Sequence, residues 1–183
     1  EHIRPKYLNH IESLGMSERI ITDKLPHNFL NLGFILCAFP EAKIIHLNRD
    51  PAAVCLSCFQ KYFPARGMGF TFDLRDLGRY YAMYLDIMDY WRAKFPGRIL
   101  DLDYKALTED QETQSRMLLE HCGLPWQDQC LEFYKTKRGV LTASQTQVRE
   151  QMYQGSSDAW KKYRKYIPDL LENWIRPALN MAR

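Results

Sequence analysis

The sequence predicts a helix-rich α/β protein built on a short parallel sheet. Residues 44–47 form a β-branched apolar run, which is typical of a strand buried on both faces of such a sheet. A second short run, residues 99–103, has the same character, and a long helical pattern separates the two. Parallel strands need a long connection of this kind. With 183 residues, the chain is expected to form a single domain, residues 1–183.

The first apolar run continues into a tight turn and a helix. Pro51 suits the first helical turn, Asp50 can cap that turn, and residues 52–62 contain no helix breaker. Arg49 is placed at the carboxyl end of the strand, where open α/β sheets bind ligands. Ser57 lies two turns into the helix and Lys61 follows four residues later, on the same side.

The segment before this unit predicts a second strand end at the same edge of the sheet. A helix is expected over residues 1–16, with its regular part beginning near Pro5, and a short strand over residues 19–22. Lys24 then follows the strand, and Asn28 can cap a helix that Pro40 closes. We therefore expect Lys24 and Arg49 to face one shared pocket.

The rest of the chain predicts further helices around a third strand. Tyr104 follows the strand at 99–103, again at its carboxyl end. Gly123 is suited to end the helix that starts near Thr108 or Asp110. Helices are expected at residues 73–94, 108–121, 126–134 and 168–181.

The composition of the sequence limits the classes of binding partner that we expect. The net charge of +3 does not call for nucleic acid, and no apolar run reaches the length of a membrane span. The five cysteines suggest buried thiols in a reducing compartment, so a cytoplasmic protein is expected. The sequence begins inside a helix-like segment, so a targeting segment before it remains an alternative. Cys55 and Cys58 could form a metal or redox pair, but both lie on the apolar face of their helix, which favours core packing and no metal.

The segment Arg49-Asp50-Pro51, with Ser57 eight residues after the arginine, resembles the 3′-phosphate-binding segment of sulfotransferases that use 3′-phosphoadenosine 5′-phosphosulfate (PAPS). Lys61 fits the branch of the tyrosylprotein and tetratricopeptide-linked bacterial sulfotransferases. The resemblance implies a P-loop NTPase-like three-layer fold. It also implies in-line transfer of a sulfuryl group to an acceptor hydroxyl, with 3′,5′-adenosine diphosphate as product and no metal.

The same resemblance assigns roles to further residues. Lys24, followed by Pro26, would reach the bridging oxygen and the sulfuryl group, and Ser144 would contact the phosphosulfate. Tyr104 would contact the adenine, although Lys105-Ala106 replaces the acidic pair that usually follows it. Without the resemblance, Lys24 is a surface lysine and Tyr104 a core aromatic.

Two roles stay open. His27 could act as the general base, as a histidine does in small-molecule sulfotransferases, but it stands one residue too late and a capping or packing role is the alternative. In the loop before Trp160, the basic residues that touch phosphate in related enzymes are absent, and Arg149 or Ser156 could replace them.

The chain carries half of the cofactor site that the resemblance implies. The glycine-rich strand–loop–helix that cradles the 5′-phosphosulfate is absent, because none of the nine glycines lies in such a loop. We therefore expect a partial domain, the C-terminal part, completed by an N-terminal segment of the same protein, with a repeat domain as a further partner. Two alternatives are a non-catalytic nucleotide-binding or interaction domain and a nucleotide kinase-like enzyme.

Overall fold

The computed structural model describes residues 2–16, 18–64, 67–135 and 149–177. Helical segments in this part of the chain greatly outnumber strands. In order, the elements are α1 (Ile3–Ser13), η1 (Pro26–Asn31), α2 (Leu32–Ala38), β1 (Ile44–Asn48), α3 (Pro51–Phe59), η2 (Gly69–Phe72), α4 (Leu74–Lys94), β2 (Ile99–Asp103), α5 (Tyr104–Glu109), α6 (Gln111–Cys122), η3 (Asp128–Lys135), η5 (Ala159–Tyr166) and η6 (Leu170–Ile175). Among the described helices, none is both long and apolar enough to cross a bilayer.

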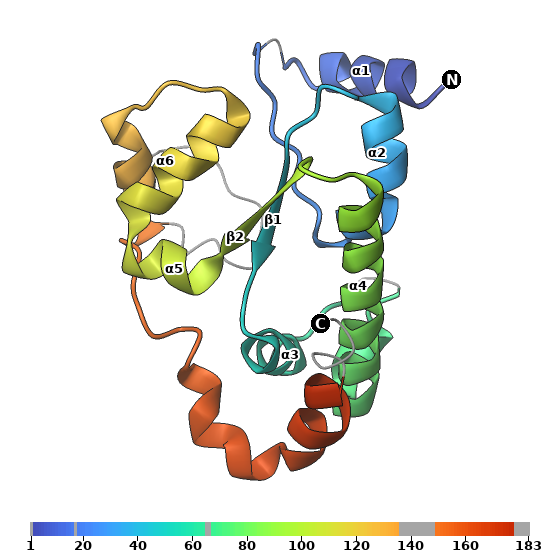
Figure 1. The fold of residues 1–183 in the computed structure, drawn as a ribbon, viewed down its shortest axis with the longest axis vertical. Coiled ribbons are helices and arrows are strands. Elements are labelled where there is room, and N and C mark those ends of the chain that lie inside the picture. Colours follow the sequence, from blue (N-terminus) through green and yellow to red (C-terminus); the bar gives the residue numbers. More distant parts are fainter. Residues whose placement is uncertain (1, 17, 65–66, 136–148, 178–183) are drawn as a thin grey trace.

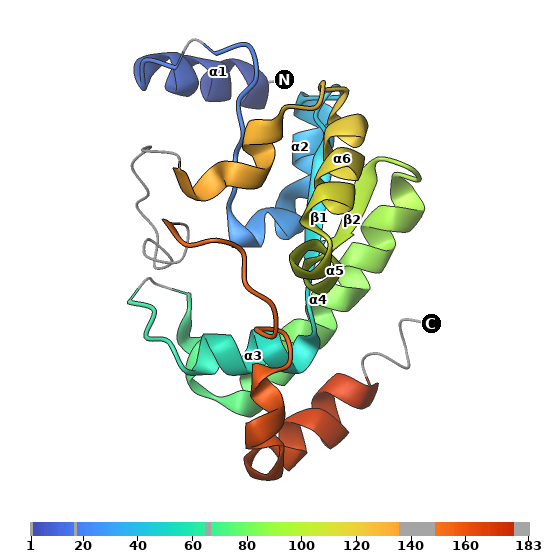
Figure 2. The same cartoon turned by 90° about the vertical axis from the view of Figure 1, so that its left-hand side faces the viewer.

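The two strands lie at the centre of the molecule. β1 and β2 pair in parallel, with His46 opposite Asp101, so the predicted parallel pairing is confirmed. Helices α5 and α6 lie on one side of the strands, and α2 and α4 on the other (Figures 1 and 2). Both strands point toward the end of the molecule that holds α3 and η5 (Figure 1). The carboxyl ends of the strands and these helical segments together form the frame of the candidate site.

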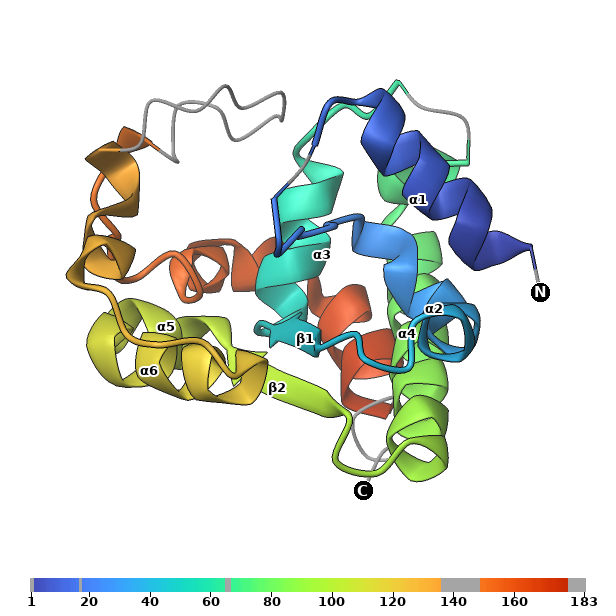
Figure 3. The ribbon, with the colours of Figure 1, turned by 90° about the horizontal axis from the view of Figure 1, so that it is seen from above.

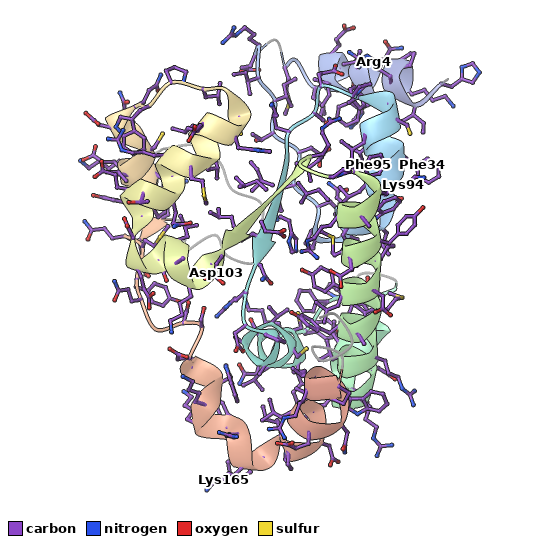
Figure 4. All side chains as sticks on the ribbon, viewed as in Figure 1. Arg4, Phe34, Lys94, Phe95, Asp103 and Lys165 are labelled. Carbon is purple, nitrogen blue, oxygen red and sulfur yellow. The ribbon has the colours of Figure 1, made fainter. Side chains whose placement is uncertain are left out.

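Carboxylates cap the helices that begin near the strand ends. The backbone N–H of Ala53 donates to Asp50 Oδ1 at 2.8 Å, which confirms the predicted cap of α3. Asp103 caps α5 in the same way, through the Ala106 N–H at 2.7 Å. Asp103 lies at the end of β2 in Figure 4. These caps fix the chain direction directly after each strand, which places Arg49 and Tyr104 reproducibly.

Three local predictions differ from the structure. Residues 19–22 form no strand, because no described strand lies beside them to accept their hydrogen bonds. Asn28 does not cap a helix; its side-chain amide donates to Asp23 Oδ1 at 3.3 Å instead. The expectation that β1 is buried on both faces is also wrong, since Ile45 and Leu47 are 40% and 51% exposed. Within the described residues, one face of β1 has no covering layer at these positions.

The core below the strands ties the C-terminal segment to α3 and α4. Cys55, Leu77 and Leu170 are almost fully buried in one cluster. Gly78 permits the close approach of α4 to the terminal helix, since a Cβ there would lie 2.4 Å from the Trp174 Cβ. This packing holds residues 159–175 firmly against the helix that carries Ser57.

A polar network fills the face of the sheet toward α4. Asp101 Oδ1 lies 2.5 Å from His46 Nδ1, and Tyr84 hydroxyl meets the other ring nitrogen of His46. Arg92 donates to both oxygens of Asp101, at 2.8 and 3.0 Å, and to Asp89 at 2.8 Å. The network therefore joins β1, β2 and α4. A histidine and an aspartate inside apolar runs are the signal in the sequence for such a network.

We expect the Asp101→Asn variant to lose stability at neutral pH but not at acid pH. The hydrogen bonds from Arg92, and then those from His46, hold the pKa of Asp101 below its usual range. A carboxylate with a lowered pKa stabilises the fold above its unfolded pKa of about 4, and this stabilisation is lost as the pH falls through the folded value. Because the side chain is 43% exposed, we expect about 1 kcal/mol, or about 2–4 °C in Tm.

Thermal unfolding of both proteins between pH 7 and pH 3 tests this expectation. The gap in Tm between wild type and Asp101→Asn should close as the pH falls. Asp86→Asn, which changes an exposed residue of α4, is the matched control. A gap that stays constant over this range would show that Asp101 contributes packing rather than charge.

Candidate functional site

A cavity of about 800 Å³ opens at the carboxyl end of β1. Its walls come from the end of β1, from α3, from the start of α5 and from the segment that leads into η5. The lining residues are Leu47, Arg49, Ala53, Val54, Leu56, Ser57, Gln60, Lys61, Tyr104, Tyr153, Gln154, Gly155, Ser156, Ala159, Trp160, Lys162 and Tyr163. Seen from above, the same elements meet around the end of β1 (Figure 3). The cavity therefore gathers segments that lie far apart in the sequence.

Arg49 belongs to the polar part of the lining. Its Nη2 donates to the backbone carbonyl of Ser156 at 2.6 Å. Its guanidinium carbon lies 5.0 Å from the centre of the Tyr104 ring. These two contacts hold the planar group in place, while Nε is buried and has no hydrogen-bond partner among the described residues. A buried N–H without a partner is costly, so an acceptor from a ligand would stabilise it.

α3 contributes the second polar wall. Ser57 is half-buried near the end of the helix, and Lys61 is exposed just beyond it. Both side chains line the cavity, on the same side as the four-residue spacing predicted. The hydroxyl and the ammonium therefore flank the space that Arg49 faces.

The electrostatics of the cavity favour an anion. The described lining carries the cations Arg49, Lys61 and Lys162, and none of its residues is a carboxylate. Two further buried polar atoms of the lining, Ser156 Oγ and Trp160 Nε1, have no hydrogen-bond partner in the described part of the chain. Positive charge and unused donors in one cavity match a ligand with charged oxygens.

Lys24 and His27 lie outside the described lining of this cavity. Lys24 is exposed, two residues before the start of η1. Its neighbour Asp23 accepts hydrogen bonds from Tyr7 at 3.1 Å and from Asn28, which anchors the segment to α1 and η1. The His27 ring packs edge-on against three aromatic rings, those of Phe29, Phe70 and Tyr80.

The remaining predicted site residues fall into two groups. Ser144 lies outside the described residues. Arg149 is described and exposed, and it is not part of the cavity lining. Ser156, by contrast, lines the cavity and accepts the hydrogen bond from Arg49.

Cys55 and Cys58 belong to the packing of α3. Cys55 is 1% exposed in the core cluster, and Cys58 packs against that cluster. Burial raises the pKa of Cys55 to about 12, so its thiol is protonated at neutral pH. In the described part of the chain, no group of three or more histidine, cysteine and acidic side chains could hold a metal ion.

Sequence reasoning missed Trp160 and Lys162 as lining residues. From the sequence alone, the basic and aromatic residues at 160–166 favour a solvated helix face, with a funnel for an acidic substrate as the alternative. In the structure, η5 packs beside α3, so its first turn reaches the cavity. A tryptophan directly before two lysines was the available signal.

A profile described as "Sulfotransferase family" matches residues 1–128, so the chain belongs to the sulfotransferase family. The fold agrees with this assignment. The structure resembles the sulfotransferase domain from the curacin biosynthetic pathway with a TM-score of 0.64, over 87% of this chain and 60% of that chain. The sequence identity of this pair is 18%, so the likeness shows the fold alone.

Two curated relatives are longer than the chain. An uncharacterised protein of Aquifex aeolicus is 47% identical over 91% of this chain and 22% of its own length. The omega-hydroxy-beta-dihydromenaquinone-9 sulfotransferase Stf3 of Mycobacterium bovis is 28% identical over 85% of this chain and 44% of its own length. The chain thus spans less than half the length of either relative.

Proposed function

We propose that this protein transfers the sulfuryl group of PAPS to an acceptor hydroxyl by in-line displacement. The observation that carries the proposal is the cavity at the end of β1. Arg49, Ser57 and Lys61 line it, and a buried N–H of Arg49 has no acceptor in the described part of the chain. Family membership supports the same activity. We also propose that the sheet belongs to a P-loop-like, three-layer fold of which this chain forms part.

The lining residues fit the nucleotide that the family implies. Arg49, Ser57 and Lys61 would hold the 3′-phosphate through charge-assisted hydrogen bonds. The Tyr104 ring, already fixed beneath the Arg49 guanidinium, would contact the adenine. When bound, PAPS supplies an activated sulfuryl group. A second cradle for the 5′-phosphosulfate would come from an N-terminal segment of the same protein.

Lys24 and Ser144 complete the proposed machinery. In sulfuryl transfer, negative charge grows on the leaving phosphate oxygen, and a preorganised ammonium stabilises it. Lys24 is the proposed source of this ammonium, because the contacts of Asp23 hold its segment in place. The acceptor is a molecule with a free hydroxyl.

The decisive experiment supplies the full-length protein with sulfur-35-labelled PAPS and three acceptors: a phenol, a primary alcohol and a tyrosine peptide. We expect label on at least one acceptor and stoichiometric release of 3′,5′-adenosine diphosphate. Parallel reactions contain ATP in place of PAPS, and calorimetry measures the binding of 3′,5′-adenosine diphosphate. Each reaction is run with and without excess chelator, because a kinase-like enzyme needs Mg²⁺ whereas the proposed transfer does not.

The outcomes separate the proposal from its alternatives. Transfer that persists in chelator supports a sulfotransferase. Tight binding of 3′,5′-adenosine diphosphate without any transfer would identify a nucleotide-binding module. Phosphoryl transfer from ATP that chelator abolishes would identify a kinase-like enzyme.

A further inference from the structure

Three buried polar atoms line the same cavity and have no hydrogen-bond partner within residues 2–16, 18–64, 67–135 and 149–177: Arg49 Nε, Ser156 Oγ and Trp160 Nε1. Two of them, the guanidinium and indole nitrogens, can only donate hydrogen bonds. The body of Trp160 packs against the core cluster, which fixes its ring. These donors therefore require an acceptor that the described protein does not provide.

The geometry of η5 places Lys162 beside this group. η5 is a 3₁₀ helix, in which side chains three residues apart lie on the same side. Ala159 and Lys162 both line the cavity. Lys165, one turn further, projects from the outer end of the molecule and is not part of the described lining (Figure 4). The Lys162 ammonium lies 5.0 Å from the centre of the Tyr163 ring, which limits its range of positions.

The segment that leads into η5 runs past α3 in Figure 2. Arg49 donates a hydrogen bond to this segment, at the backbone carbonyl of Ser156, which lies 107 positions later in the chain. Arg49 and Trp160 therefore line the same cavity, on either side of Ser156 in the lining. Lys61, just after α3, and Lys162, in η5, line the same cavity.

We infer that Trp160 and Lys162 are binding residues for the anion that Arg49 holds, and that they make η5 the second half of a two-sided phosphate clamp. This inference rests on the proposed function, which identifies the anion as the 3′-phosphate of the nucleotide. Trp160 donates its indole N–H, and Lys162 provides a charge that offsets one of the phosphate charges. The clamp selects nucleotides with a 3′-phosphate over those without one.

Calorimetric titration of the full-length protein with 3′,5′-adenosine diphosphate and with AMP tests the clamp. Lys162→Met keeps the aliphatic stem over the Tyr163 ring but removes the charge. We expect about 10-fold weaker binding of 3′,5′-adenosine diphosphate and nearly unchanged binding of AMP. Lys165→Met, which removes the same charge one turn away, should leave both affinities within about 2-fold.

Trp160→Phe tests the indole N–H separately. The variant keeps an aromatic ring in the core and loses the donor, and its Tm is compared with that of wild type to verify that it folds. We expect about 5- to 10-fold weaker binding of 3′,5′-adenosine diphosphate.

Two results would overturn the inference while leaving the proposed function intact. One is an unchanged affinity of Lys162→Met and Trp160→Phe for 3′,5′-adenosine diphosphate, while Arg49→Ala binds this nucleotide more weakly than wild type. The other is an equal loss in Lys162→Met and Lys165→Met, which would show a diffuse field rather than a contact. No preference of wild type for 3′,5′-adenosine diphosphate over AMP would overturn both proposals together.

Discussion

Replacing Arg49 by alanine is expected to weaken the binding of 3′,5′-adenosine diphosphate about 10- to 100-fold. The Arg49 side chain combines a permanent charge, a guanidinium plane held by two contacts and a buried N–H that lacks a partner among the residues the structure describes. The carbonyl of Ser156 and the ring of Tyr104 hold the guanidinium before any ligand binds, so little order has to be created on binding. The loss should be much smaller for AMP, which lacks the 3′-phosphate.

Two further variants sharpen this test. Arg49→Lys keeps the charge without the planar fork, so an intermediate affinity is expected. Arg116→Ala is the matched control, because the Arg116 guanidinium also lies over an aromatic ring, that of Trp126 at 3.9 Å, but outside the described lining of the cavity. Its affinity should equal that of wild type. If the Arg49→Ala protein binds 3′,5′-adenosine diphosphate as tightly as wild type, the proposed role of Arg49 in binding the 3′-phosphate is wrong.

The unit around Arg49 could be predicted because its signals are local. The apolar run, the cap at Asp50 and the proline at position 51 lie within ten neighbouring residues, and each favours the same strand–turn–helix. Spacing along α3 then placed Ser57 and Lys61 on one side, and both line the cavity with Arg49. Tyr104 joined them because parallel strands end at the same edge of a sheet.

Long-range contacts could not be predicted in this way. Ser156 meets Arg49 across 107 positions, and no pattern near either residue encodes that meeting. Trp160 and Lys162 reach the cavity only because η5 packs beside α3, a consequence of core packing with Cys55 and Leu170. The strand expected at residues 19–22 failed for a related reason, since a strand is defined by its neighbour as well as by its own sequence.

The second large effect is expected in catalysis, for Lys24→Ala. If the Lys24 ammonium stabilises the charge that grows on the leaving phosphate oxygen, its removal should lower kcat about 100- to 1000-fold. The interaction strengthens only in the transition state, so the KM for PAPS and the Kd for 3′,5′-adenosine diphosphate should change by less than about 3-fold. This division differs from that of Arg49→Ala, which acts on binding. Steady-state kinetics and calorimetry on the same preparation measure both quantities.

The role of Lys24 is tested by kinetics rather than by binding, because the Lys24 side chain does not line the described cavity. Lys43→Ala is the matched control: it removes an exposed lysine next to the amino end of β1, whereas the proposed chemistry lies at the carboxyl end. Its kcat should match that of wild type. If Lys24→Ala retained the wild-type kcat, the leaving oxygen would need another cation. The phosphate clamp around Arg49 would still stand, since its evidence is binding and does not depend on Lys24.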